Sequence, residues 1–379
     1  MKLLKLLLIA LLCLAPALTH ADFRGAWVAT VWNINFPSRQ GLSPDQQKRE
    51  IRNLVANAKA VGLNALVVQV RTESDALYKS RYEPWARWLT GSQGRDPGYD
   101  PLATFIQEGK RAGIEIHAWI NPYRAAANKS HPRSSSHPSN KFRSSLKTVN
   151  TMLWLDPGDP KVRDHIVRVV KDLVSRYDVD GVHMDDYFYP YPKNAARPAS
   201  FNDSRTYKAY GRGMSLADWR RDNVNQLISE VSRAVKSERR SAKFGVSPFG
   251  IYTKGEPADV KAGVDQLNML YADPLLWMRK GWVDYLAPQL YWPDKGPQSF
   301  SSLLKWWRDP KNNPRKVPIY PGIAVDRMTS HGWSSNEIAR QLDLEDRIGP
   351  RDGAGFLLWN MKAVMNNTKG VRKVIEREK

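Results

Sequence analysis

Two adjacent acids, Asp185 and Asp186, are the residues of this sequence whose types and spacing most directly suggest chemistry. They end a short apolar run that starts after Asp180, and aromatic residues and a proline follow, Tyr187 to Pro190. This pattern is typical of a buried strand that delivers its last residues to an aromatic-lined opening, which suits a sugar. Two carboxylates so close cannot both ionise freely, so one is expected to keep its proton toward neutral pH and to act as a general acid. The alternative, a salt-linked surface turn, is less favoured because an apolar strand precedes the pair.

The second catalytic group is open between several arrangements. Asp273 follows the fifth predicted strand and could face the same opening, although Asp before Pro at a helix start is equally typical of an N-cap. Glu73 and Asp75, just past the second strand, are alternative bases, with loop solvation as their other role. In a third scheme the N-acetyl group of the substrate is the nucleophile. One Asp then orients this group, the other protonates the leaving group, and Tyr291 bonds the acetamido oxygen.

His183 lies two residues before Asp185, so strand alternation places both on one face, and His183 is expected one layer beneath as a hydrogen-bond donor to Asp185. Other strand ends carry polar and aromatic side chains that suit sugar binding. The expected substrate-binding residues besides His183 are Arg71, Asn121, Tyr123, Tyr187, Gln289, Tyr291, Trp292 and Trp359. Arg71 could instead neutralise the Asp pair, and core packing is the alternative for Trp359.

No metal or cofactor is expected. His117 and His183 are isolated within strands, which is typical of core histidines, and there is no phosphate loop or dinucleotide fingerprint.

These side chains need a fold that gathers strand ends, and the chain offers eight apolar strands, each followed by a helix. The predicted strands are residues 24–32, 65–71, 114–124, the stretch opening at 180, 242–250, 283–292, 317–325 and 355–360. The predicted helices are 44–60, 101–112, 160–177, 216–237, 274–280, 300–308, 335–347 and a closing helix. The sequence therefore predicts a single (β/α)8 TIM barrel over residues 22–379. Its long polar loops after strands 3 and 4, residues 125–150 and 191–215, belong to the face where barrel enzymes keep their active sites.

The first 21 residues read as a secretory signal cleaved after Ala21, with Lys2 and Lys5 before an apolar run. A lipoprotein anchor at Cys13 is the less favoured alternative, because the bulky Leu12 precedes that cysteine. With 58 basic and 38 acidic residues the formal charge is +20. For an exported protein, the acidic partners are cell-wall polymers, anionic glycans or membrane surfaces rather than nucleic acid. No later apolar run is long enough to span a membrane.

Several separated motifs, in this order, resemble the glycosyl hydrolase-like 10 family of bacterial exported proteins. They are Arg24-Gly25-Ala26-Trp27, Gln69-Val70-Arg71, the run from His117 to Arg124, the run from Asp180 to Tyr189, Gly245-Val246-Ser247-Pro248 and the run from Ala287 to Trp292. The resemblance implies a barrel glycosidase and, by similarity to division-associated members, periplasmic or envelope hydrolysis of peptidoglycan strands stripped of stem peptides. It also implies possible divisome or envelope partners. Strand four resembles the chitinase pattern Asp-Gly-x-x-x-Asp as well, but Tyr187 stands where that family has its acid glutamate.

Two other classes compete with an exported glycosidase. One is a non-catalytic cell-wall glycan-binding protein that uses the same groove, held to the polymer by its positive charge. The other is a scaffold that partner proteins recruit through the long loops.

Overall fold

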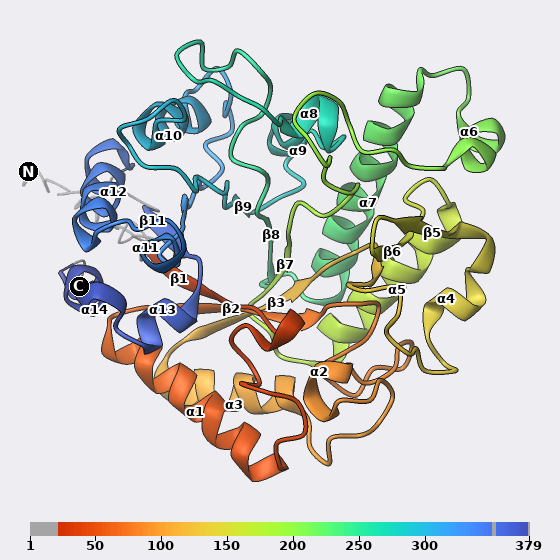
Figure 1. The fold of residues 1–379 in the computed structure, drawn as a ribbon, viewed down its shortest axis with the longest axis horizontal. Coiled ribbons are helices and arrows are strands. Elements are labelled where there is room, and N and C mark those ends of the chain that lie inside the picture. Colours follow the sequence, from red (N-terminus) through yellow and green to blue (C-terminus); the bar gives the residue numbers. More distant parts are fainter. Residues whose placement is uncertain (1–21, 351–353, 378–379) are drawn as a thin grey trace, which may run out of the picture.

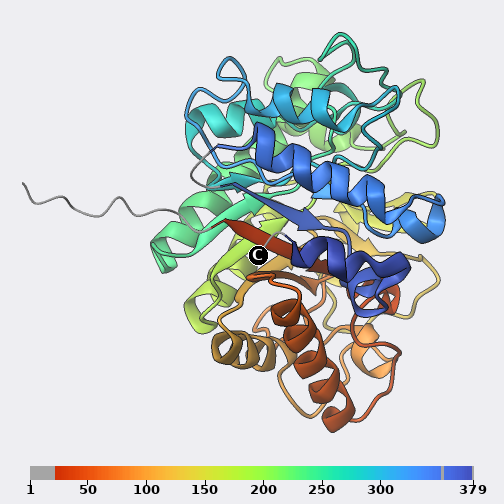
Figure 2. The same ribbon diagram turned by 90° about the vertical axis from the view of Figure 1, so that its left-hand side faces the viewer.

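The computed structural model describes residues 22–350 and 354–377, and they form a (β/α)8 barrel, as the strand and helix pattern predicts. Eight parallel strands form the sheet, in the spatial order β10-β11-β1-β2-β3-β7-β8-β9. Their bounds are β1 (Phe23–Val28), β2 (Ala65–Arg71), β3 (Glu115–Ile120), β7 (Gly181–Met184), β8 (Lys243–Val246), β9 (Tyr285–Leu286), β10 (Gly322–Ile323) and β11 (Gly355–Leu358). Figure 2 shows β1 and β11 side by side, although they stand at opposite ends of the chain.

The two outermost strands of this order meet and close the barrel. Parallel bridges join Leu286 to Ile319 and Gln289 to Gly322. Backbone hydrogen bonds support them, including Tyr320 N to Leu286 O at 2.9 Å. A closed parallel barrel brings the carboxyl ends of all eight strands to one face.

Helices surround the sheet in chain order, and Figure 1 shows them as a ring from α1 through α12 to α14. The helices are α1 (Pro44–Ala60), α2 (Arg87–Thr90), α3 (Pro101–Ala112), α4 (Pro138–Lys141), α5 (Pro160–Arg176), α6 (Ser204–Tyr210), α7 (Leu216–Glu238), α8 (Gln266–Met269), α9 (Pro274–Lys280), α10 (Phe300–Arg308), α11 (Arg327–Ser330), α12 (Ser335–Ile348), α13 (Met361–Met365) and α14 (Val371–Glu376). Short 3-10 turns are η1 (Val31–Asn33), η2 (Arg143–Ser145) and η3 (Thr368–Gly370).

Local sequence signals explain where the principal helices begin. At α1, the Ser43 side chain accepts from the backbone of Gln46, and the Gln46 side chain accepts from the backbone of Ser43, a capping box with Pro44 at the first position. Asp159 caps α5 in a similar way, and Pro160 follows it. Such caps satisfy backbone N–H groups that the helix itself leaves unpaired.

The loop after β3 contains structure that the sequence did not predict. A small antiparallel sheet, β4 (Arg124–Ala126), β5 (Leu146–Val149) and β6 (Met152–Leu155), has the order β4-β6-β5. The loop after β7 carries α6. Both loops follow the carboxyl ends of barrel strands, so they flank the face of the barrel where the Asp pair lies.

The inside of the barrel is filled by large aromatic side chains, among them Phe23, Trp27, Trp119 and Tyr285. A separate and larger apolar cluster lies between the strands and the outer helices. The interior is therefore a packed core, and ligands must bind at its end. Among the helices of the described ranges, none has the length and apolar character needed to cross a bilayer.

Candidate active site

A cavity of about 500 Å³ lies at the carboxyl ends of the barrel strands. Both members of the Asp pair contribute to its wall, together with tryptophans, tyrosines and two arginines. It is lined by Trp27, Val31, Trp32, Ile34, Gln69, Trp119, Arg124, Ala127, Met152, Asp185, Asp186, Tyr187, Tyr191, Ser247, Gln289, Tyr291, Arg327 and Trp359. Asp185 and Asp186 are the carboxylates of this lining, and they follow β7 directly.

Asp185 is fixed by hydrogen bonds from neighbouring strand β3 and from its own turn. The indole Nε1–H of Trp119 donates to its Oδ2 at 3.1 Å, as does the Nδ2 amide of Asn121, also at 3.1 Å. The backbone N–H of Tyr187 donates to Oδ1 at 3.3 Å. Burial raises the pKa of Asp185, and the positive charge of Arg124 acts against that rise. The result is an oriented carboxylate with most of its acceptor sites already used.

Asp186 has a different environment from Asp185. Burial, followed by the charge of Asp185, raises the pKa of Asp186 to about 7. The hydroxyl of Tyr191 donates to Oδ2. Oδ1 is buried and has no hydrogen-bond partner within the described part of the chain. A pKa of about 7 leaves Asp186 partly protonated at neutral pH, as expected for one member of the pair, and general acids of glycosidases have a pKa raised in this way.

His183 does not contact Asp185, so the expected hydrogen bond between them is wrong. Its Nδ1 pairs with the Tyr285 hydroxyl at 3.0 Å, its Nε2 with the Ser247 hydroxyl at 3.0 Å, and Trp27 Nε1–H donates to Nε2 at 3.3 Å. Two residues along a strand span roughly 6.6 Å, and each of these side chains bonds instead to groups of neighbouring strands. Burial lowers the pKa of His183, so it supports the floor as a neutral ring.

Aromatic side chains form the walls of the cavity. Trp359 lies edge-on to Trp27 and to Trp119, each with ring centroids 6.0 Å apart. On another side Tyr187 packs against Tyr191 at 5.4 Å, and the guanidinium of Arg124 lies 5.5 Å from the Tyr187 ring centre. Rings held in this way offer flat faces for stacking on sugars.

Of the predicted site residues, the cavity brings together Asp185, Asp186, Tyr187, Gln289, Tyr291 and Trp359. Asn121 is not part of the cavity lining, and it fixes Asp185 by donating a hydrogen bond to its carboxylate. Gln289 donates to the Ser247 carbonyl at 3.0 Å.

Other predicted site residues lie away from the cavity wall. Arg71 is fully buried in an ion pair with Glu83 at 2.6 Å, so it neither clamps a substrate nor touches the Asp pair. Tyr123 is also fully buried, and Trp292 packs edge-on against Phe249. These three assignments were wrong in their geometry. A register shift between Gln69 and Arg71 interrupts the strand alternation there, and Tyr123 and Trp292 lie beyond the last ladder residues of β3 and β9.

Asp273 occupies the helix cap that was its alternative assignment. Its Oδ1 accepts from Leu276 N at 3.0 Å and from the Tyr252 hydroxyl at 3.1 Å, outside the cavity. Glu73 likewise accepts from the backbone N–H of Ala127 within the loops.

Sequence reasoning missed several residues of the wall. Trp119 lies two positions before Asn121, so strand alternation could have placed it on the same face. Trp32, Arg124, Tyr191 and Arg327 lie in the connections after strand ends, in or beside short elements whose few residues give no periodic pattern to show which way a side chain points. In the described ranges no group of three or more His, Cys, Asp or Glu side chains is arranged to hold a metal ion.

Comparisons with known proteins identify the family and the fold of this chain. Residues 22–337 match the model of the family described as glycosyl hydrolase-like 10. The chain is 38% identical to the glycosyl hydrolase YngK of Bacillus subtilis, over 95% of this chain and 72% of that protein. It is 34% identical to the glycosyl hydrolase DigH of Escherichia coli, over 88% and 82%. The PgaB (BpsB) glycoside hydrolase domain of Bordetella bronchiseptica has a similar fold, with a TM-score of 0.62 at 15% identity, over 94% of this chain and 99% of that one.

Proposed function

The chain belongs to the glycosyl hydrolase-like 10 family and is a glycoside hydrolase, and we propose that it cleaves peptidoglycan glycan strands that lack stem peptides. The observation that carries the proposal is the position of Asp186, whose pKa is raised to about 7, beside a fixed Asp185 in an aromatic cavity. The choice of polymer rests on the motifs that resemble division-associated members. The basic character of the chain, with a formal charge of +20, suits an acidic wall polymer.

The arrangement of the carboxylates favours participation by the substrate. Enzymes that use two carboxylates on opposite sides of the bond hold them roughly 5 to 9.5 Å apart across the sugar. Here both cavity carboxylates leave the end of one strand, and in the described ranges the facing strands contribute none to the lining. We therefore infer that the acetamido oxygen of the substrate attacks the anomeric carbon, while Asp185 accepts from the acetamido N–H.

The remaining groups complete this reaction. As the bond to the leaving oxygen breaks, Asp186 transfers its proton to that oxygen, so the leaving sugar departs as a neutral hydroxyl. Tyr291 lines the same cavity, and its hydroxyl can donate to the acetamido oxygen. Water then attacks the anomeric carbon and returns a proton to Asp186, which restores the resting state. Export is part of the proposal, because peptidoglycan lies outside the cytoplasmic membrane.

The test is mass spectrometry of products from purified, peptide-free glycan strands, which reports the bond cut and the new end. Asp186→Asn and Asp185→Asn should each lower kcat by roughly 10²- to 10⁴-fold, the usual range for general acid–base groups. Asp273→Asn is the matched control, because Asn also caps helices and the residue lies outside the cavity. Turnover that survives Asp186→Asn would refute the assignment. Glycan binding without products in the parent protein would favour the binding-protein alternative.

A further inference from the structure

Beside the catalytic cavity lies a second one, and we propose that it binds a carboxylate carried by a neighbouring sugar of the same glycan chain. The inference rests on the proposed function, because it assigns part of that substrate to a place outside the cavity of the Asp pair. It adds a cationic subsite formed by Lys193, Arg197 and Asn150.

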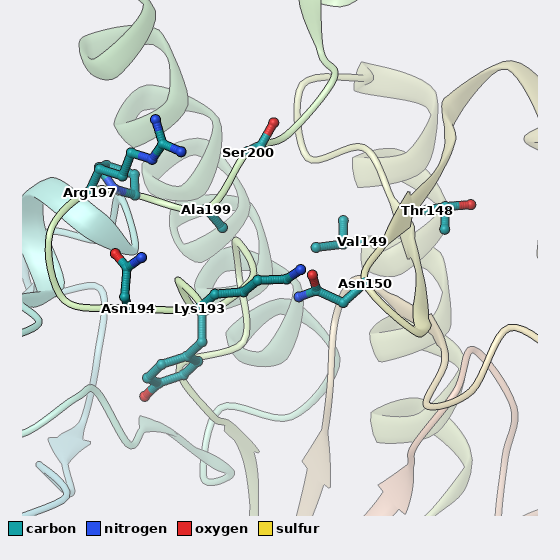
Figure 3. Close-up of a pocket in the computed structure, with 10 residues that line it drawn as sticks. Thr148, Val149, Asn150, Lys193, Asn194, Arg197, Ala199 and Ser200 are labelled. Carbon is teal, nitrogen blue, oxygen red and sulfur yellow. The ribbon is translucent and has the colours of Figure 1, made fainter.

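The second cavity, about 620 Å³, lies between two inserted loops. One wall is the β5–β6 hairpin, with Asn150 in its turn, and the other is the segment after β7 from Lys193 to Ser200 (Figure 3). Figure 3 shows the Lys193 side chain reaching across the opening toward the amide of Asn150. Asn150 has a φ of 55°, a left-handed turn conformation that Asn tolerates. Its amide group is exposed and can donate to a ligand.

The charges of this cavity are of one sign. Lys193 and Arg197 line it, while Asp and Glu are absent from its ten lining residues. Both cations are exposed, and neither has a hydrogen-bond or ion-pair partner among residues 22–350 and 354–377. By contrast Lys147, in the adjacent strand β5, is paired with Asp156 at 3.9 Å. Unpaired cationic side chains in one cavity attract an anion, and the cavity therefore has a higher affinity for an anionic ligand than for a neutral one.

Tyr191 connects the two cavities. It lines both of them, and its hydroxyl donates to Asp186. A polymer with its scissile bond at Asp186 that extends past Tyr191 therefore places its next sugars over Lys193 and Asn150. The loop that carries the cations is held in place by Lys254, whose Nζ donates to the carbonyl of Ala195 at 3.2 Å.

The chemistry of the proposed substrate fits these groups. Peptidoglycan strands without stem peptides carry a lactyl carboxylate on alternate sugars, whereas chitin has the same backbone and no charge. A carboxylate can accept from an ammonium, a guanidinium and an amide together. The subsite therefore favours the acidic polymer over the neutral one.

The experiment compares two oligosaccharides with equal numbers of rings, a peptide-free glycan-strand oligomer and a chitin oligomer. Calorimetry gives the Kd of each with the Asp186→Asn protein, which prevents turnover. Adding Lys193→Gln with Arg197→Gln should raise Kd for the carboxylated oligomer about tenfold, and less than about twofold for chitin. The swap Lys193→Arg with Arg197→Lys should retain the preference, because it keeps both charges.

Lys171→Gln with Arg233→Gln is the control, since it removes two exposed charges from the outer faces of α5 and α7. It should leave both Kd values unchanged. An equal loss for both oligomers in the Lys193/Arg197 variant, or no loss for either, would overturn the subsite. If the unaltered protein neither binds nor cleaves either oligomer, the proposed function falls as well, so the two failures are distinguishable.

Discussion

The surroundings of Asp186 disfavour the ionised form of its carboxyl group. Burial and the neighbouring Asp185 raise its pKa to about 7, while the hydrogen bond from Tyr191 lowers it. A general acid must be protonated to act, so kcat/KM should fall as pH rises through about 7.

Removing the Tyr191 hydroxyl should move this limb of the pH profile in a defined direction. Tyr191→Phe deletes a donor to the charged form of Asp186, so the pKa rises and the alkaline limb shifts up by about one pH unit. The measurement is kcat/KM on peptide-free glycan strands from pH 4 to 9. Tyr207→Phe, whose hydroxyl donates to the Met214 carbonyl, is the control and should leave the limb in place. A shift to lower pH would contradict the assignment of the acid.

At the scale of residues, the sequence predicts the protonation of the Asp pair better than it predicts which side chains contact the pair. Adjacency indicated that one Asp would keep its proton through charge repulsion, but burial, which adjacency does not show, is the larger cause of the raised pKa of Asp186. The donors to Asp185 could not be chosen in the same way. Trp119 and Asn121 reach it from β3, and the pairing of β3 with β7 depends on the register of the barrel.

At the scale of elements, the helices follow local signals, and β2 has its predicted bounds, but two other strands are much shorter than predicted. The bounds of α1, α3, α9 and α10 are those predicted, because caps and terminal glycines act within one turn. The predicted strands 283–292 and 317–325 shrink to the two-residue ladders β9 and β10. Pro288, Pro318 and Pro321 interrupt these segments, and proline has no N–H for a ladder. Isolated bridges continue the pairing instead.

The sequence also did not predict the β4-β6-β5 sheet. Its segment is rich in Ser, Lys and Asn, which is typical of a loop, and its strands are three or four residues long. Their pairing gives them stability that no single strand has.

The 3-10 turn η1 presents Trp32, which is 53% exposed although it lines the catalytic cavity. Trp88 and His131 hold its ring at centroid distances of 5.2 and 5.3 Å. A fixed, exposed indole is a platform for a sugar ring, so Trp32→Ala should raise KM about three- to tenfold with little change in kcat. Steady-state kinetics on glycan strands give both values. Tyr210→Ala, 40% exposed at the end of α6, is the control, and a loss confined to kcat in the Trp32 variant would contradict the stacking role.

Across the whole molecule, a hydrogen-bonded chain runs through the barrel toward the active-site floor. Glu115 pairs with His117 at 3.1 Å, and the Tyr285 hydroxyl lies between His117 and His183 at 2.9 and 3.0 Å. His183 in turn contacts Ser247 of the cavity. Satisfied polar groups in a packed interior specify one arrangement of side chains, so this chain holds the floor in a fixed geometry.

A buried ion pair outside the barrel links stability to pH. Burial alone would raise the pKa of Glu83, but the charge of Arg71 and a hydrogen bond from His165 bring it down to about 2, from an ordinary 4.5. A depressed pKa contributes stability that is present above pH 4.5 and lost as pH falls toward 2, roughly 3 kcal/mol in all. Glu83→Gln removes this contribution and leaves the Arg71 charge buried without a partner. The free energy of unfolding at pH 7 should therefore fall by about 3–5 kcal/mol.

The same substitution should also flatten the dependence of stability on pH. Urea unfolding of the parent and of Glu83→Gln at several pH values between 7 and 2 measures both effects. Asp164→Asn, an exposed carboxylate on α5, is the matched control and should reproduce the parent curve. If Glu83→Gln lost stability at pH 7 but kept the parent's slope between pH 4.5 and 2, other carboxylates would dominate acid unfolding. The Arg71–Glu83 pair would then stabilise the fold by packing alone.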